Sequence, residues 1–198
     1  MTGHGCQVME RRLILVKHSH PQVDPDVTAA EWRLSDVGKA RCLALADLLR
    51  SYNVEALVAS PEPKAIETAE LVGERLGLSV EVVGGLQEHD RGNVSFYESH
   101  DEFKEVVKRL FERPDELVMG RETAVQARTR FAKALDDVLA NHSTGNIAVV
   151  THGTVISLYI GQVAGVGAYD LWGRLGLPSF TVLSLPDLRL VETVESIE

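Results

Sequence analysis

Two histidines in this 198-residue chain each follow a run of four apolar residues and one polar residue. His18 comes after the run from Leu13 to Val16 and Lys17, and His152 comes after the run from Ile147 to Val150 and Thr151. Short apolar runs that end in polar residues are typical of strands buried on both faces of a parallel sheet. Because the carboxyl ends of parallel strands meet at one edge, where open α/β folds bind ligands, we expect both imidazoles at that edge.

Two cations and a hydroxyl group are predicted at the same edge. Lys17 precedes the first histidine, Ser60 follows a short apolar run over residues 56–59, and Lys64 lies in the first turn of the next predicted helix. Two ammonium groups, two imidazoles and the N–H groups of helix starts suit a dianion. The residue types therefore indicate a site for a phosphate monoester.

These side chains could transfer a phosphoryl group through one of the histidines. A neutral imidazole is nucleophilic near pH 7, and a second, protonated imidazole would stabilise the phosphoryl oxygens as charge develops. The leaving oxygen also needs a proton donor. Glu88 and, as a less favoured candidate, Asp90 stand in the polar loop after the third predicted strand.

The elements that must position these residues alternate between strand and helix, which predicts a layered α/β domain. Ser35 is expected to cap the first helix, and Ser60 followed by Pro61 is expected to begin the second. We treat the chain as one domain, with residues 1–10 as a loose tail and residues 89–122 as a small cap-like insertion. The predicted helices cover about residues 36–51, 61–76, 103–112, 122–141 and 155–163, and the predicted strands cover residues 13–16, 56–59, 78–83, 147–151, 180–185 and 188–194, the last two at a sheet edge.

The composition is that of an ordinary globular protein, long enough to form a core without disulfides. A formal net charge of −9 argues against nucleic acid or an anionic membrane as a partner. Cys6 and Cys42 are too few for a disulfide framework, so we expect a cytoplasmic protein. No apolar run is long enough to span a membrane. The edge strands near the C-terminus could pair between two copies and form a homodimer.

Three motifs, taken in this order, resemble the histidine phosphatase superfamily, which has the phosphoglycerate mutase-like fold. They are the histidine after the first strand, Ser-Pro-x-x-Lys-Ala-x-x-Thr-Ala-Glu over residues 60–70, and Val-Thr-His-Gly from Val150. The resemblance implies a three-layer α/β/α sandwich with a mostly parallel central sheet. It also implies a phosphohistidine intermediate at His18, with His152 as its charged partner across the phosphate and Glu88 as the acid.

The chain departs from the family pattern at its cations. Lys17 and Lys64 stand where the family usually has phosphate-binding arginines, and Ser19 replaces the usual glycine after the nucleophile. A lysine is a point charge without the two-pronged fork of arginine, so we expect a working but altered phosphate site. The residues that we assign to phosphate binding are Lys17, Ser19, Lys64 and Gly153. The residues expected to support the site from the following helix are Glu122, Thr123 and Arg128.

We therefore expect a phosphatase that hydrolyses a small phosphorylated metabolite through phosphohistidine, with neither a cofactor nor a catalytic metal. A mutase is less favoured, because the phosphoglycerate mutases of this family are typically longer between the acid loop and the late helix. A second hypothesis is a weakened or non-catalytic member of the same fold that binds a phosphate ligand. A third is a metal hydrolase with His18 and His20 as zinc ligands, although the barrel that usually houses that motif needs about 250 residues.

Overall fold

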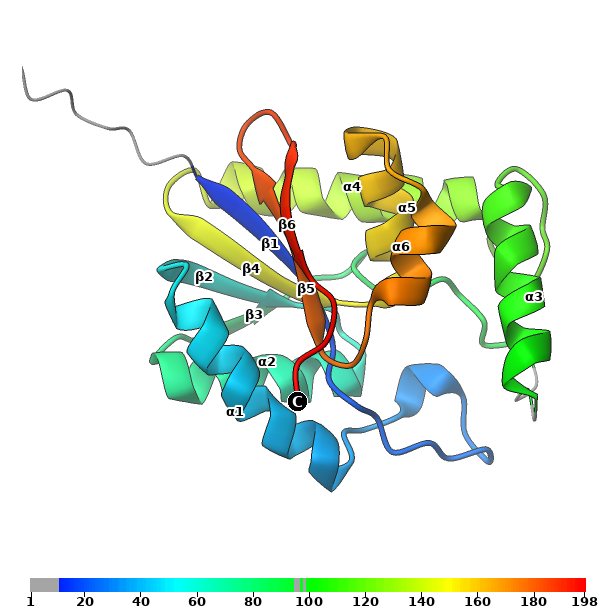
Figure 1. Ribbon diagram of the computed structural model, residues 1–198, viewed down its shortest axis with the longest axis horizontal. Coiled ribbons are helices and arrows are strands. Elements are labelled where there is room, and N and C mark those ends of the chain that lie inside the picture. The colour runs from blue at the N-terminus through cyan, green and yellow to red at the C-terminus, as the bar shows by residue number, and fades with distance from the viewer. Residues whose placement is uncertain (1–10, 95–96, 98) are drawn as a thin grey trace, which may run out of the picture.

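A single mixed sheet of six strands forms the centre of the computed structural model, which describes residues 11–94, 97 and 99–198 (Figure 1). The strand order is β3-β2-β4-β1-β5-β6. The first four strands along the chain run parallel to one another, β5 runs antiparallel to β1, and β6 runs antiparallel to β5. The strands are β1 (Arg12–Lys17), β2 (Val54–Ala59), β3 (Val80–Val82), β4 (Asn146–Thr151), β5 (Ser179–Ser184) and β6 (Leu190–Val194).

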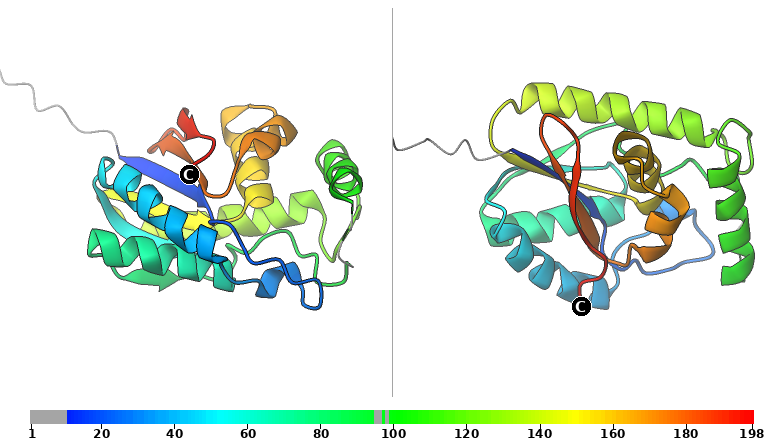
Figure 2. Two further views of the ribbon diagram at one scale, coloured as in Figure 1. Left: turned by 60° about the horizontal axis from the view of Figure 1, so that its bottom comes forward. Right: turned by 45° about the horizontal axis from the view of Figure 1, so that its top comes forward.

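Helices cover both faces of the sheet, which confirms the predicted three-layer α/β/α sandwich (Figures 1 and 2). Alternate residues of β1 point to opposite faces, so Leu13 and Leu15 pack in the core beneath α4 and α5. Ile14 and Val16 pack in the second core, beneath α1 and α2. The helices are α1 (Asp36–Arg50), α2 (Pro63–Leu76), α3 (His100–Glu112), α4 (Ala124–Asn141), α5 (Gly153–Ala164) and α6 (Ala168–Arg174), with a short 3₁₀ turn η1 (Ala29–Glu31).

The predicted start is confirmed for α1 and is wrong for α2. The Ser35 side chain caps α1 by accepting a hydrogen bond from the Gly38 N–H group. However, α2 begins at Pro63 and not at Pro61, and Glu62 is its N-cap residue. The Ser60 hydroxyl group accepts the Glu62 N–H group at 3.4 Å and also contacts His152, the histidine at the end of the neighbouring strand. Ser60 thus joins the turn before α2 to the second histidine.

Two smaller differences concern element length, and a third is an additional helix. The helix α4 begins at Ala124, where Thr123 and Gln126 form a capping box, and not at residue 122. The strand β3 covers only three residues. The sequence pattern does not predict α6, because seven residues give too short an apolar pattern to distinguish a helix from a loop.

The last two strands differ in burial. The predicted pair lies at one end of the sheet, but only β6 is an edge strand, and every residue of β5 is buried between β1 and β6. The predicted tail over residues 1–10 lies outside the described residues. Within the part of the chain that is described, no helix is both long enough and apolar enough to cross a bilayer.

Candidate active site

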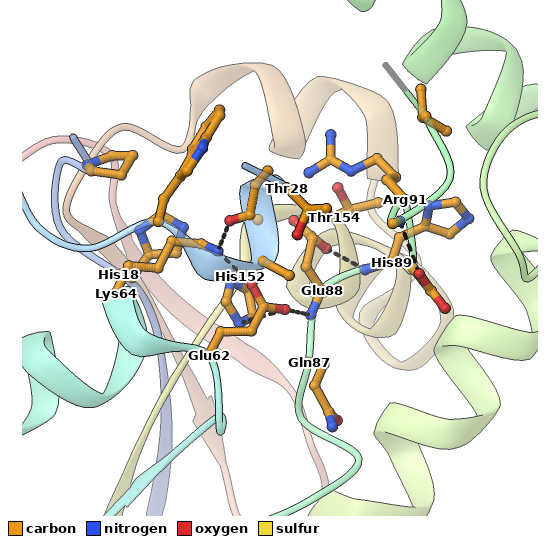
Figure 3. Close-up of a pocket in the computed structure, with 18 of the residues that line it drawn as sticks. His18, Thr28, Glu62, Lys64, Gln87, Glu88, His89, Arg91, His152 and Thr154 are labelled. Carbon is orange, nitrogen blue, oxygen red and sulfur yellow. Dashed lines mark hydrogen bonds and ion pairs between the residues drawn. The ribbon is translucent and has the colours of Figure 1, made fainter. Parts of the chain in front are cut away.

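The structure brings the two predicted histidines together at one edge of the sheet. β1 and β4 are parallel neighbours with Lys17 opposite Thr151, so the next residue of each strand end, His18 and His152, leaves the sheet beside the other. Their ring centroids are 5.2 Å apart with the planes at 62°. Both rings line a pocket of about 960 Å³, into which the acid loop also projects (Figure 3).

The contacts of His18 determine which of its ring nitrogens carries the hydrogen. Nδ1 lies 2.7 Å from the carbonyl oxygen of Ser19, and a carbonyl oxygen can only accept, so Nδ1 carries the hydrogen. The lone pair therefore resides on Nε2 in the neutral ring. Burial, together with the charges of His152 and Lys64, lowers the pKa of His18 well below its usual value. His18 is thus a neutral imidazole at pH 7 with a nucleophilic Nε2.

His152 is fully buried, and its Nε2 lies 2.8 Å from the Ser60 hydroxyl oxygen. Burial and the nearby Lys64 ammonium lower the pKa of His152 well below its usual value, although Glu88 acts in the opposite direction. These causes favour a neutral His152 ring at pH 7. The predicted positive charge of His152 across a phosphate stays a prediction.

The Glu88 carboxylate caps the start of α5. Its oxygens accept hydrogen bonds from the backbone N–H groups of Thr154 at 3.1 Å, Val155 at 3.2 Å and His89 at 2.9 Å. Burial alone would raise the pKa of Glu88, but the Arg91 guanidinium and these N–H groups outweigh it, so the pKa is lowered. The N–H groups of Thr154 and Val155 at the start of α5 are therefore already bonded to Glu88. They differ in this from the general expectation that the N–H groups of helix starts bind the phosphate.

The alternative acid, Asp90, has a different environment. Its side chain is exposed, accepts the Gly92 N–H group at 3.0 Å and lies 4.0 Å from Arg121. Both carboxylates line the pocket, but Glu88 is the one whose charge acts on the pKa of His152 (Figure 3).

Both predicted lysines reach the pocket, and both are already hydrogen-bonded. Lys17 Nζ donates to the carbonyl oxygen of Leu175 at 2.6 Å, and burial lowers the pKa of Lys17 to about 8. Lys64 Nζ donates to the carbonyl oxygen of Ala29 at 2.6 Å and forms a buried ion pair with Glu62. Gly153 also lines the pocket, and a Cβ atom there would lie 3.1 Å from Lys17 Cε, so glycine leaves room for that side chain.

Ser19 lies apart from the pocket, so its predicted role in phosphate binding gains no support from its contacts and stays a prediction. The residue is fully buried, its N–H group donates to the Thr68 hydroxyl oxygen at 3.0 Å, and its own hydroxyl donates to the Gly38 carbonyl oxygen at 2.7 Å. Both polar groups thus join β1 to α1 and α2. Ser19 holds the turn after the nucleophile and is not among the residues that line the pocket.

Glu62 is a buried carboxylate in the site that the sequence motifs do not single out. Its Oε1 accepts the Glu88 N–H group at 2.8 Å and lies 3.5 Å from His152 Nε2, while Oε2 pairs with Lys64 (Figure 3). One side chain therefore links the acid loop, the second histidine and a phosphate-site cation. The available signal was an acidic residue between two prolines, two positions before Lys64 in the recognised motif.

Replacing Glu62 by glutamine is expected to destabilise the fold by about 3 kcal/mol, because it leaves the Lys64 ammonium buried without a counter-charge. Urea unfolding followed by circular dichroism would measure the loss. The double variant Glu62→Gln, Lys64→Met should recover most of it, since neither charge remains. If the single and double variants were equally unstable, lost packing would be the cause and not the unpaired ammonium.

Arg130, on α4, clamps the acid loop. Its guanidinium donates to the carbonyl oxygens of Gly85 at 2.8 Å, Gln87 at 3.0 Å and Glu88 at 3.1 Å. It also forms an ion pair with Glu122 at 2.5 Å. Support from the start of this helix is thus provided by Glu122, as predicted, but the arginine that contacts the loop is Arg130 and not Arg128.

Replacing Arg130 by lysine should lower kcat about tenfold, because a single ammonium cannot hold three carbonyl groups and Glu88 loses its position. The loss should be greater for esters with poor leaving groups, which depend on the acid. Arg128→Lys, on the same helix, is the matched control. Equal losses for good and poor leaving groups would show that Arg130 does not act through Glu88.

Arg91 places a guanidinium beside the acid. It lines the pocket, its Cζ atom lies 5.1 Å from the centroid of the Phe103 ring, and its charge lowers the pKa of Glu88. The residue pattern alone does not determine the direction of this side chain. Beside the two lysines of the pocket, Arg91 supplies a planar cation from the loop.

The structure does not place His18 and His20 together as zinc ligands at this edge. His20 does not line the pocket, and its Nδ1 lies 3.0 Å from the Ser35 hydroxyl oxygen. Across residues 11–94, 97 and 99–198, no group of three or more His, Cys, Asp or Glu side chains is placed to hold a metal ion.

Comparisons with known proteins point to one family. A protein of Hydrogenobacter thermophilus named "Putative phosphoserine phosphatase 2" is 23% identical over 169 residues, which cover 82% of this chain and 83% of that protein. The mycobacterial glucosyl-3-phosphoglycerate phosphatase superposes with a TM-score of 0.75 at 20% identity, over 94% of this chain and 99% of the other. The alpha-ribazole phosphatase of Shigella flexneri gives 0.72 at 20% identity, over 93% and 96%. Because the family model of the histidine phosphatase superfamily (branch 1) matches residues 13–190, almost the whole length of the fold, this chain belongs to that superfamily.

Proposed function

We propose that this protein hydrolyses phosphate monoesters through a phosphohistidine formed on His18. The observation that carries the proposal is the pairing of two buried imidazoles, 5.2 Å between centroids, in which His18 has its lone pair on Nε2. The relatives that are named phosphatases support the same reaction class.

In the first step His18 Nε2 attacks phosphorus, an N–P bond forms and the P–O bond to the alcohol breaks. The departing oxygen takes a proton from Glu88. The Ser19 carbonyl oxygen, which accepts the Nδ1 hydrogen, stabilises the positive charge that the ring gains. In the second step water attacks phosphorus, Glu88 takes its proton, and the N–P bond breaks to release inorganic phosphate.

Glu88 must acquire its proton before it can act as an acid. Its pKa is lowered in the ligand-free protein. A phosphate dianion bound beside it would place two negative charges near the carboxylate and raise the pKa. Substrate binding would therefore load the donor, and it would also charge His152 for stabilisation of the phosphoryl oxygens.

A non-catalytic phosphate binder is the alternative. The fixed tautomer of His18 and the clamp on the Glu88 loop favour the enzyme, because a binder needs neither a nucleophile nor an oriented acid. The chain as one domain with a cap over residues 89–122, its cytoplasmic location and its independence of metal are further parts of the proposal.

Rapid quenching of turnover with a ³²P-labelled ester tests the proposal. We expect label on the protein that is stable in base, is lost in acid and maps to His18, with turnover unchanged by EDTA. Label-free protein that still binds phosphate would favour the binder, and loss of turnover in EDTA would favour a metal hydrolase.

The pKa of Lys17 predicts a pH dependence. With a folded-state value of about 8, the ammonium is charged at pH 7 and loses its proton as the pH rises through 8. Phosphate monoesters are already dianionic there. We therefore expect loss of this proton to steepen the fall of kcat/KM with pH by about tenfold per pH unit above pH 8. Lys17→Arg should remove this additional limb, because a guanidinium stays charged. An unchanged limb in that variant would assign it to another group.

A further inference from the structure

The pocket extends well beyond the groups that would hold a phosphate. Its volume of about 960 Å³ lies at the upper end of the range for sites that enclose a drug-sized ligand. The histidines, lysines and carboxylates occupy one end. Most of the remaining wall is apolar, and its main apolar residues are Val27, Trp32, Val94, Phe103, Trp172 and Leu177.

Contacts within the protein hold the aromatic part of this wall in place. Phe103 on α3 and Trp172 on α6 meet edge to face, with centroids 6.1 Å apart. Trp172 is stacked on Tyr169 at 5.8 Å, and the Arg91 guanidinium covers Phe103. Contacts on several sides hold these rings in place, so little ordering is needed when a ligand packs against them.

Several polar groups near this wall already have partners within the protein. Trp32 lines the pocket, and its indole N–H group donates to the Asp24 carbonyl oxygen at 2.8 Å. His89 Nε2 bonds to the Glu122 carbonyl oxygen, and the Glu122 carboxylate is held by Arg130. A sugar or an amino acid would have to lose its hydration here for few new hydrogen bonds.

From this lining we infer that the alcohol part of the substrate is apolar and carries a planar ring, which packs against Phe103 and Trp172 while the phosphate lies between the histidines. This inference rests on the proposed function and narrows it, since the sequence indicated only a small phosphorylated metabolite. Aromatic pairs with offset or edge contacts stabilise such a ring beyond the burial of its area.

Four phosphates of primary alcohols test the inference with one leaving-group chemistry: 2-(1-naphthyl)ethyl phosphate, 2-phenylethyl phosphate, O-phosphoserine and glycerol 3-phosphate. We expect kcat/KM for the naphthyl ester to exceed that for glycerol 3-phosphate at least tenfold, mainly through KM. Trp172→Ala and Phe103→Leu should each reduce this ratio at least threefold. Lys104→Ala, an exposed change on α3, should retain it.

Binding to the unaltered protein provides a test that needs neither turnover nor a folded variant. Calorimetry should show that 2-(1-naphthyl)ethylphosphonate binds at least tenfold more tightly than ethylphosphonate. Equal affinities, or a preference for glycerol 3-phosphate in turnover, would overturn the inference and leave the phosphatase intact. If no ester were hydrolysed but the naphthyl phosphonate bound tightly, the proposed reaction would fail and the apolar pocket would stand.

Discussion

Replacing His18 by asparagine is expected to lower kcat more than about 10⁴-fold, because the variant has no nitrogen that can form the N–P bond. The effect should be the same for every ester, since the same atom attacks each of them. Stopped assays with p-nitrophenyl phosphate and with an alkyl phosphate would measure it. The quenched variant should also carry no acid-labile phosphate.

His20→Asn is the matched control for this variant. The residue lies two positions away, is exposed and bonds to Ser35 outside the pocket. Its removal should change kcat less than twofold. If both asparagine variants lost activity to the same extent and zinc restored the parent enzyme after chelation, the two histidines would be metal ligands and the phosphohistidine reaction would be wrong.

The sheet and the meeting of the histidines could be predicted because both depend on local pattern and one rule of topology. The apolar runs that precede His18 and His152 define buried strands, and parallel neighbouring strands bring the residues after their carboxyl ends to one edge of the sheet. Glu88 could be placed at the same edge because its loop comes after a third parallel strand. Periodicity and chain order sufficed for these three residues.

The hydrogen-bond partners could not be predicted in this way. Ser19 and Ser60 look alike in the sequence, as small hydroxyl residues at strand ends. Ser19 turns inward to Thr68 and Gly38, whereas Ser60 faces His152. The direction depends on which neighbouring helix offers a partner, and that partner lies far away in the sequence. For the same reason the contacts of Arg130 with the acid loop could not be predicted, because the two partners lie more than forty residues apart in the sequence.

The protonation of the site depends on its total charge and not on single residues. Lys64 lowers the pKa values of both histidines, while Glu62 supplies a negative charge to the same buried volume. The sequence shows two lysines near the histidines, but it does not show that a buried carboxylate pairs with one of them. The site is therefore less positive than its lysines indicate.

Replacing Glu88 by glutamine should slow hydrolysis of alkyl phosphates about 10³-fold and of p-nitrophenyl phosphate less than tenfold. An alkoxide leaves poorly without a proton, whereas nitrophenolate is stable as an anion, so only the first reaction needs the acid. The amide keeps the size of the carboxyl group but cannot donate a proton as an acid. A series of esters with different alcohol pKa values would measure the effect as a steeper dependence of kcat on leaving group in the variant.

Asp90→Asn is the corresponding carboxylate-to-amide control, in the same loop and exposed to solvent. It should leave the dependence on leaving group unchanged. In Glu88→Gln the new amide would also turn an N–H group toward some of the backbone donors that the Glu88 carboxylate now accepts, which could shift α5. Such a shift would slow good and poor leaving groups alike. A uniform loss in Glu88→Gln, together with a leaving-group effect in Asp90→Asn, would therefore transfer the role of proton donor to Asp90.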